Sequence, residues 1–294
     1  MYKALADAIR DAQSRGVTLS RVALDAEAKD QGRPVAEIRD ALGRALVVMR
    51  GAVERGLEGD LRSASGLVGG DAEKLRAGPP GPLAGTLFRD VLARALAVQE
   101  VNAAMGVIVA APTAGGAGVL PAVLTGIARD RGLGDEALIS ALATAGLIGA
   151  VVAERASLSG AEGGCQAETG AAAGMAAGAA VELLGGTPSQ SGHAVALTMQ
   201  GMLGLICDPL GGLVELPCVY RNATGAAIAL AGIEMAMAGV TFAIPVDEVI
   251  DVMGEVGRTM DVRYRETAGG GLAATPTGRR LARERLVQIK RGGD

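Results

Sequence analysis

Three cysteines are the residues of this sequence best suited to chemistry, because a thiolate is both a nucleophile and a metal ligand. Cys165 follows two glycines, Cys207 precedes an Asp-Pro pair, and Cys218 follows a proline. Each is therefore expected in a loop at a helix end. The odd count and the lack of a CxxC pair argue against a disulfide framework and a zinc finger. Two interpretations stay open: buried structural thiols or ligands of a metal cluster.

The surroundings of the cysteines favour the cluster. Thiolate-bound clusters need backbone donors directed at sulfur and small residues that permit close approach. Both are supplied by Gly163 and Gly164 before Cys165 and by the stretch DPLGG after Cys207. Three thiolates on a [4Fe–4S] cluster leave one iron without a protein ligand, and such an iron is a Lewis acid for a substrate oxygen.

The loop PTAGGAG, residues 112–118, is typical of an anion cradle. A threonine hydroxyl opens it, and we expect the N–H groups that follow to turn inward where the glycines adopt positive φ. A substrate carboxylate is the expected guest, and a tight turn between buried helices is the alternative. The predicted substrate contacts in this loop are Thr113, Ala114, Gly115 and Gly116.

A second small-residue loop, SASGLVGGDAEKL, covers residues 63–75. Its predicted substrate contacts are Ser65 and Gly66, with Ser63 and Asp71 as further polar candidates. The alternative is a plain helix N-terminus in which Asp71 is the cap or a first-turn acid.

Several polar residues stand beside the cysteine motifs and are expected either to hold the ligands in place or to be satisfied core residues. They are Glu168 (or Glu162), Asp208, Asn222 and Arg221.

The elements that must position these residues are helices. From Leu87 to about Val256 the sequence is almost wholly apolar at helical spacing, with Gly/Pro turns between segments and few alternating strand patterns. Glycines at 170, 174 and 178 are spaced for close helix packing. The predicted fold is all-α: Gly/Ala-rich buried helices surrounded by amphipathic helices, with cluster-binding loops at helix ends.

We expect residues 1–294 to form a single domain. Residues 1–60 are an amphipathic helical N-terminal region, 61–280 the substrate- and cluster-binding core, and 281–294 a basic C-terminal tail. A Pro/Gly break, AGPPGPLAG, occupies residues 77–85. The apolar face of the third predicted helix comprises Val35, Ile38, Leu42, Ala45, Leu46 and Met49.

Composition excludes several classes of function. Hydrophobic residues make up 49% of the 294 residues and aromatics 2%, so Ala, Val, Leu, Ile and Met must fill the core. The net charge of −4 with no basic block argues against nucleic acid as a partner. The charged N-terminus does not resemble a signal peptide.

Two apolar stretches, Val101–Ala128 and Ala137–Ala153, are candidate membrane spans. The first is interrupted by prolines and glycines, and the second only reaches the short end of the ~17–25 residues that a span needs. We expect both to be buried helices, no membrane, and a cytoplasmic protein whose thiols stay reduced. A helical membrane or scaffold protein, with Gly/Ala patterns that serve packing alone, is the competing class.

Five collinear segments resemble the α chain of the iron–sulfur-dependent L-serine dehydratases. The two cysteine spacings, 42 and 11 residues, also match that family. The resemblance covers nearly the whole chain and is weakest in the first ~55 residues. The segments are SGLVGGDAEKL (65–75), NAAMGVIVAAPTAGGAGVLPAVL (102–124), SGAEGGCQAETGAAAGMAAGA (159–179), GLICDPLGGLVELPCVYRNATGAA (204–227) and RETAGGGLAATPTG (265–278).

The resemblance implies a cofactor and a reaction. It implies that Cys165, Cys207 and Cys218 hold a [4Fe–4S] cluster whose open iron activates the serine hydroxyl as a leaving group. L-serine is then converted to pyruvate and ammonia without pyridoxal phosphate; a relative acting on L-cysteine or L-threonine is the alternative. Gly116 stands where many members carry serine, which puts one hydroxyl contact in doubt.

The resemblance also implies a partner. The sequence holds one histidine, His193, at the start of a predicted amphipathic helix, and nothing in the resemblance makes it catalytic. In this family the proposed base is a histidine of a β domain. A separate β chain is therefore the implied partner, with the N-terminal region as a candidate contact.

Overall fold

The computed structural model describes residues 2–79 and 85–291 of the chain, with side chains described as far as residue 285. These residues form thirteen α-helices, joined by loops and short 3-10 and π turns, and contain no β-strand. One isolated β-bridge joins Cys207 and Arg265. The predicted all-α class is confirmed.

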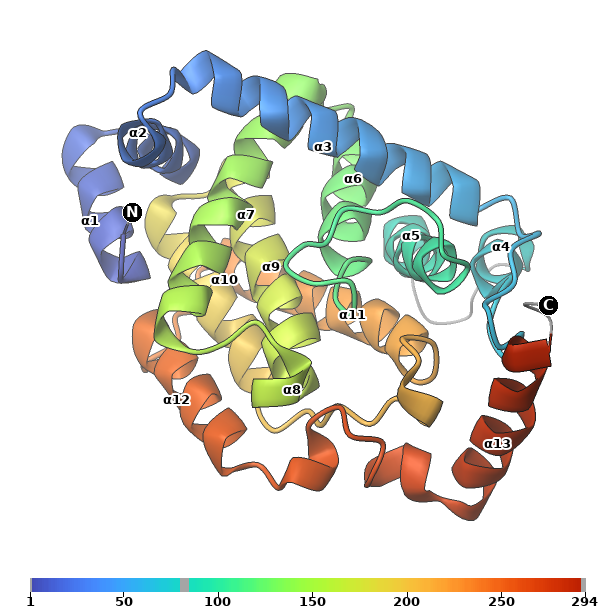
Figure 1. Cartoon of the computed structure of the whole chain (residues 1–294). Helices are drawn as coiled ribbons and strands as arrows, with labels where there is room; N and C mark the ends of the chain where they lie inside the picture. Colours follow the sequence, from blue (N-terminus) through green and yellow to red (C-terminus); the bar gives the residue numbers. More distant parts are fainter. Residues whose placement is uncertain (1, 80–84, 292–294) are drawn as a thin grey trace.

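The helices follow one another along the chain with short connections (Figure 1). They are α1 (Leu5–Arg15), α2 (Leu19–Gln31), α3 (Val35–Gly56), α4 (Asp71–Ala77), α5 (Thr86–Ala103), α6 (Val119–Arg131), α7 (Asp135–Arg155), α8 (Gly160–Gly163), α9 (Ala171–Leu183), α10 (Pro188–Met199), α11 (Cys218–Met237), α12 (Val246–Thr259) and α13 (Pro276–Arg291). A π turn, η1 (Gln166–Gly170), leads directly into α9, and η2 (Gln200–Met202), η3 (Leu210–Gly212), η4 (Val262–Tyr264) and η5 (Gly271–Ala274) are 3-10 turns.

The centre of the fold is α9, which Figure 1 shows enclosed by other helices. Every residue from Ala171 to Val181 is buried, and α6, α7, α10 and α11 pack around it. Small side chains make this possible: a Cβ added at Gly178 would lie 2.5 Å from Ile148 Cδ1 and 2.8 Å from Val195 Cγ2. The predicted close packing along this glycine-rich segment is confirmed.

The first three helices form part of the outer layer, as the amphipathic pattern predicts. Ile38, Leu46 and Met49 of α3 are buried, whereas Val47 is 70% exposed. Helix α3 ends at Gly56, close to the expected end of the N-terminal region.

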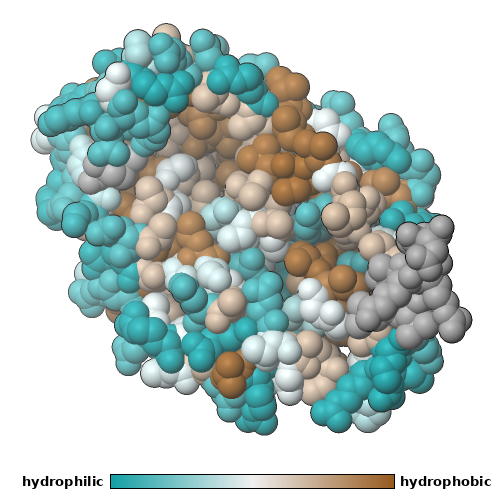
Figure 2. Space-filling view, viewed as in Figure 1, coloured by the Kyte–Doolittle hydropathy of each residue, from teal (hydrophilic) through white to brown (hydrophobic). Residues whose placement is uncertain are grey.

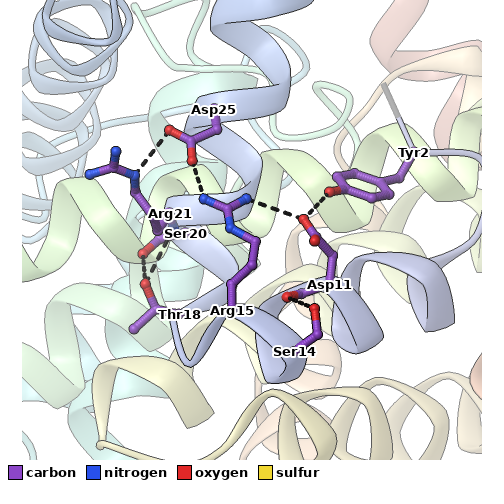
Figure 3. Close-up of polar contacts among 8 residues, drawn as sticks. All are labelled: Tyr2, Asp11, Ser14, Arg15, Thr18, Ser20, Arg21 and Asp25. Carbon is purple, nitrogen blue, oxygen red and sulfur yellow. Dashed lines mark hydrogen bonds and ion pairs between the residues drawn. The ribbon is translucent and has the colours of Figure 1, made fainter.

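Helices α1 and α2 are joined by a network of charged side chains (Figure 3). Arg15 lies between Asp11 and Asp25 and forms an ion pair with each. The Tyr2 hydroxyl donates to Asp11 at 2.6 Å, and Arg21 Nε donates to Asp25 at 3.0 Å. These contacts fix the angle between the two helices.

Two buried or half-buried carboxylates attach this pair of helices to the rest of the molecule. Asp247, near the start of α12, accepts the Leu5 N–H at 2.7 Å and so caps α1 across 242 residues of sequence. Glu182 of α9 accepts the Ser20 N–H at 3.0 Å and the Thr144 hydroxyl at 2.8 Å. Because carboxylates stabilise free helix N–H groups, both contacts favour this placement.

Helix α7 contains the uninterrupted apolar stretch, Ala137–Ala153. It is the one helix of the described chain that is long and apolar enough to cross a membrane, and 61% of its most apolar window is buried inside the protein. It packs against α9 and α2. The prediction of a buried helix here is confirmed.

The predicted tail forms a helix, α13, as far as Arg291. The described part of the predicted Pro/Gly break lies between α4 and α5. Residues 80–84 of that break, and residues 292–294 of the tail, lie outside the described residues.

Gly56 tests the close approach of α3 to α5. A Cβ at this position would lie 2.1 Å from the carbonyl oxygen of Ala97, so Gly56→Ala must push the two helices apart. We expect a loss of about 1–3 kcal/mol of unfolding free energy in urea titrations. Gly51→Ala on the same helix meets nothing within 4 Å and should gain up to about 1 kcal/mol from helix propensity. Equal effects at both positions would contradict the packing described.

Candidate active site

The side chains of Cys165 and Cys207 are in contact and buried. The Cys207 thiol donates a hydrogen bond to Cys165, which lowers the pKa of Cys165 to about 7 and raises that of Cys207 well above its usual range. Thr169 Oγ1 lies 3.1 Å from the Cys165 sulfur. The pair therefore favours one thiolate even in the absence of a metal.

A glycine turn and the π turn present Cys165 to this contact. Gly164 has φ of +74°, a conformation that glycine adopts without strain, and a Cβ there would lie 2.8 Å from the Leu205 carbonyl oxygen. The N–H of Gln166 donates to the same carbonyl at 3.0 Å. The loop that holds Cys165 is thus bound to the segment that leads into Cys207.

The segment after η4 holds Cys207 from its other side. The Cys207 N–H donates to the Tyr264 carbonyl, and the Glu266 N–H donates to the Cys207 carbonyl, both at 2.8 Å. The next residue, Asp208, is buried, forms an ion pair with Arg221 of α11 at 2.7 Å and accepts the Leu272 N–H at 2.6 Å. Asp208 therefore ties three segments together around Cys207.

Cys218 is the first residue of α11 and is also buried. Burial raises the pKa of its thiol to about 12, and the nearby Cys165 and Glu168 add to this shift. One turn later, the Asn222 amide donates to the Cys218 carbonyl at 2.9 Å and to the Gly115 carbonyl at 2.7 Å. Helix α11 thus joins the third cysteine to the glycine-rich loop.

The glycine-rich loop is packed directly against Glu168 of the π turn. Thr113 donates its hydroxyl proton to Glu168 Oε1 at 2.7 Å. A Cβ at Gly115 would lie 2.8 Å from that carboxylate, and a Cβ at Gly116 would lie 2.8 Å from the Glu168 carbonyl oxygen. The predicted positive φ in this loop is wrong: these glycines and Gly118 have negative or extended φ. Close approach to Glu168, not left-handed backbone, requires glycine here.

Three consecutive N–H groups of this loop are free. Within the part of the chain that the structure describes, the N–H groups of Ala114, Gly115 and Gly116 have no hydrogen-bond acceptor. The N–H of Gly118, by contrast, donates to Asn222 Oδ1 at 2.9 Å. Gln99 of α5 donates to the Ala114 and Gly115 carbonyls at 2.9 and 3.3 Å. Free N–H groups in a largely buried loop are suited to an anionic guest.

Glu168 connects the loop to the thiols. Its carboxylate accepts from Thr113 on one side, and on the other its Oε2 lies 3.9 Å from the Cys207 sulfur. Burial raises the pKa of this carboxyl group. The loop, the carboxylate and the three cysteines therefore form one continuous site.

Other predicted residues have different contacts. The Ser65 hydroxyl and N–H are both bonded to the buried carboxylate of Glu215, three residues before Cys218. The neighbouring Gly66 makes a turn, its N–H bonded to the Ser63 carbonyl. Asp71 is the first residue of α4, as the alternative interpretation expects.

Glu162 and His193 do not face the cysteines. Glu162 is exposed and accepts the Ser157 hydroxyl at 2.6 Å, so Glu168 is the carboxylate of this stretch that belongs to the site. His193 Nδ1 accepts the Phe242 N–H at 3.3 Å. It lies on α10, two residues before Val195. Val195 packs against α9 at Gly178, two helical turns away from the π turn.

Gln99 and Glu100 are almost fully buried in α5 and were not predicted from the sequence as part of the site. Gln99 holds the glycine-rich loop, and Glu100 accepts the N–H groups of Gly70, Asp71 and Ala72 at the start of α4. Burial raises the pKa of Glu100. The signal was present in the sequence: adjacent polar residues inside an otherwise apolar helix, VQEVN.

The donor set fits a thiolate-bound cluster. Three buried thiols converge among small residues, and a Cβ at Gly160 would lie 3.2 Å from the Cys207 sulfur. No group of three or more His, Cys, Asp or Glu side chains in residues 2–79 and 85–285 is close enough to hold one metal ion. The fit to a cluster therefore rests on the chemistry of the three thiols and on the small residues around them.

Comparison with known proteins identifies the class. The family model for the serine dehydratase alpha chain matches residues 14–273, and the chain belongs to this family. The resemblance found in the sequence is confirmed, and so is the enzyme class, a lyase.

Individual relatives are similar over most of their length. The chain is 48% identical to the probable L-serine dehydratase, alpha chain, of Bacillus subtilis, covering 97% of this chain and 95% of that one. It is 39% identical to the L-serine dehydratase, alpha chain, of Peptoniphilus asaccharolyticus, covering 93% and 94%. It is 42% identical to the L-serine dehydratase of Streptomyces coelicolor, covering 90% of this chain and 59% of that longer one.

Asn222 provides a test of how the loop is held. Asn222→Asp removes the amide group that donates to the Gly115 and Cys218 carbonyls and places a carboxylate oxygen against them. We expect the free energy of unfolding, from thermal or urea titrations, to fall by about 2–5 kcal/mol. Asn102→Asp is the matched control, because Asn102 also donates to two oxygens but is half-buried. Asn102→Asp should lower the free energy of unfolding by less than half as much as Asn222→Asp. A smaller loss at Asn222 than at Asn102 would show that the loop is held otherwise.

Proposed function

We propose that this chain is the α chain of an L-serine dehydratase, which converts L-serine to pyruvate and ammonia. The observation that carries the proposal is the convergence of the Thr113–Gly116 loop and three buried thiols on Glu168. The substrate follows from the relatives, which are named as L-serine dehydratase alpha chains.

The proposed cofactor is a [4Fe–4S] cluster bound by Cys165, Cys207 and Cys218, without pyridoxal phosphate. When bound, it supplies a Lewis acid that makes the serine hydroxyl a better leaving group. Glycine at position 160 keeps a side chain away from the Cys207 sulfur, which a Cβ there would approach to 3.2 Å. Because all three thiols are free, we propose a reducing compartment, the cytoplasm.

The glycine-rich loop is proposed to bind the substrate carboxylate. The free N–H groups of Ala114, Gly115 and Gly116 are suitable donors, with the Thr113 hydroxyl at the entrance. Gln99 and Asn222 keep the loop carbonyls occupied, so the N–H groups need not reorganise when substrate binds. Glu168 positions Thr113. Ser65, which is hydrogen-bonded to Glu215, and the adjacent Gly66 are proposed to border the site.

Removal of the Cα proton requires a base. His193 is bonded to Phe242 on another part of the fold, which supports a base on a β partner chain. The relatives named alpha chain and the longer Streptomyces coelicolor dehydratase support such a partner. Residues 1–294 are proposed to act as one domain, since Leu5 and Leu19 share the core cluster of α9.

An exposed apolar surface beside the glycine-rich loop is the proposed contact for the β chain. Met105 and Val107, in the α5–α6 connection, are 85% and 76% exposed, and Val47 of α3 is 70% exposed. Figure 2 shows hydrophobic colour over α3 and the neighbouring loop. An adjoining cavity of about 330 Å³ is lined by Val48, Gly51, Ala52, Arg55, Leu61, Val101, Ala104, Gly106 and Val107.

This surface is held rigidly. Met105 has φ of +62°, which is unfavourable for a residue with a Cβ. Its N–H donates to the Asn102 carbonyl at 3.0 Å, and the Gly106 N–H donates to the Val101 carbonyl at 2.8 Å. Exposed apolar side chains on an ordered loop indicate a protein contact, and its position next to the proposed substrate loop favours the chain that supplies the base.

Anaerobic co-expression with a candidate β chain tests the function. We expect brown protein that releases pyruvate from L-serine, with L-threonine and L-cysteine as competing substrates. Cys207→Ser should abolish both pyruvate release and the absorption near about 400 nm expected of iron–thiolate charge transfer. His193→Gln is the control and should retain both. A full cluster without serine turnover would contradict the assigned substrate, and normal absorption in Cys207→Ser would contradict the ligand set.

The partner surface has its own test. The double variant Met105→Asp, Val107→Asp should weaken binding of the β chain at least about tenfold, because buried apolar anchors carry most of the affinity of an interface. Val240→Asp is the control, since Val240 is 45% exposed and follows α11 near Phe242. An unchanged Kd in the double variant, measured by calorimetry, would exclude this surface.

A further inference from the structure

We propose a second small-molecule site, for a carboxylate anion, in a cavity of about 310 Å³ between α8, α12 and the segment after η4. It is distinct from the glycine-rich loop and goes beyond the proposed dehydratase activity. The residues on which the argument rests are Ser157, Glu162, Gly163, Gly254, Arg258 and Arg265.

Two guanidinium groups line this cavity without a hydrogen-bond or ion-pair partner, although the Asp261 carboxylate is near enough to Arg265 for their charges to interact. Neither Arg258 nor Arg265 forms an ion pair or side-chain hydrogen bond with any residue in the described ranges, and Arg265 Nε is buried without an acceptor. Two neighbouring arginines are paired: Arg263 with Asp261 at 3.0 Å, and Arg155, whose Nε also lacks an acceptor, with Asp251 at 2.6 Å. Because a buried guanidinium N–H without an acceptor is costly, an anion that accepts from Arg265 Nε is favoured here.

The charge of the lining matches a single negative charge. Glu162 also lines the cavity, and its carboxylate accepts the Ser157 hydroxyl at 2.6 Å. Two arginines and one glutamate leave a net charge of +1. A monoanion therefore neutralises the site, and the planar forks of Arg258 and Arg265 suit a carboxylate.

The cavity is kept open by small residues. Gly163, Gly254 and Gly257 form part of its wall, and a Cβ at Gly254 would already lie 3.1 Å from Arg258 Nη1. The volume admits an acid of three or four carbon atoms. A 2-oxo acid is a monoanion and matches the charge of the lining, whereas a zwitterionic amino acid carries the same carboxylate without net charge; the test separates these two sources.

The cavity lies behind the Cys165 turn, not in the candidate active site. Gly163 and Ala167, which line it, stand two residues before and two residues after Cys165. The Cys165 sulfur itself contacts Cys207 and Thr169. A ligand in the cavity would therefore contact the backbone that presents the cysteine without competing for the glycine-rich loop.

Calorimetric titration of the full chain with sodium pyruvate, L-serine and sodium phosphate tests the site. We expect pyruvate or L-serine to bind, and Arg265→Gln and Arg258→Gln each to raise its Kd at least about tenfold, as expected for loss of a charge-assisted hydrogen bond. Arg280→Gln is the control, because Arg280 is exposed and paired with Glu284 at 3.0 Å outside the cavity, and the Kd of this variant should be unchanged. Arg258 is exposed, so its variant remains informative if Arg265→Gln fails to fold.

Thr113→Val separates this site from the glycine-rich loop. Binding that survives Thr113→Val and is weakened by Arg258→Gln supports the proposal. Three results overturn it: no binding of either carboxylate, binding that depends on Thr113 alone, or phosphate binding more tightly than both carboxylates. Pyruvate release by the complex with the β chain is measured separately, so loss of the proposed function and loss of this site are distinguishable.

Discussion

A single half-buried carboxylate, that of Glu168, is the contact on which the site depends. It accepts from Thr113, its Oε2 lies 3.9 Å from the Cys207 sulfur, and its charge helps to raise the pKa of Cys218. The glycines at 115 and 160 lie where any Cβ would fall within 3 Å of its oxygens. The loop, the thiols and the small residues around them are thus arranged about the Glu168 carboxylate. These neighbours together shield that carboxylate from solvent.

The core explains how a carboxylate can be held there. Helix α9 continues directly from the π turn and is buried along its length, so the backbone that carries Glu168 cannot shift without disturbing α6, α7, α10 and α11. Large side chains would have separated these helices. A core built from alanine and glycine therefore gives rigidity through short distances between backbones, in place of interlocking bulky groups.

The sequence predicts the helical class and the placement of the cysteines at helix ends, because both follow from local patterns of apolar residues, glycine and proline. It does not predict partners that are far apart in the chain. Ser65 binds Glu215 across 150 residues, and Gln99 reaches the loop from another helix. The incorrect expectation of positive φ at Gly115 and Gly116 has the same origin, because Glu168, which demands glycine at both positions, lies some 50 residues away in the sequence.

The π turn at Gln166–Gly170 has a consequence for how the site can vary. A π turn is equivalent to one residue inserted in an α-helix, and each residue of an α-helix rotates the chain by about 100°. Shortening this segment by one residue would restore regular helix and turn Glu168 away from Thr113, although every other side chain stayed the same. The site is therefore specified by chain length as well as by residue type, and a deletion here is a more severe change than most substitutions.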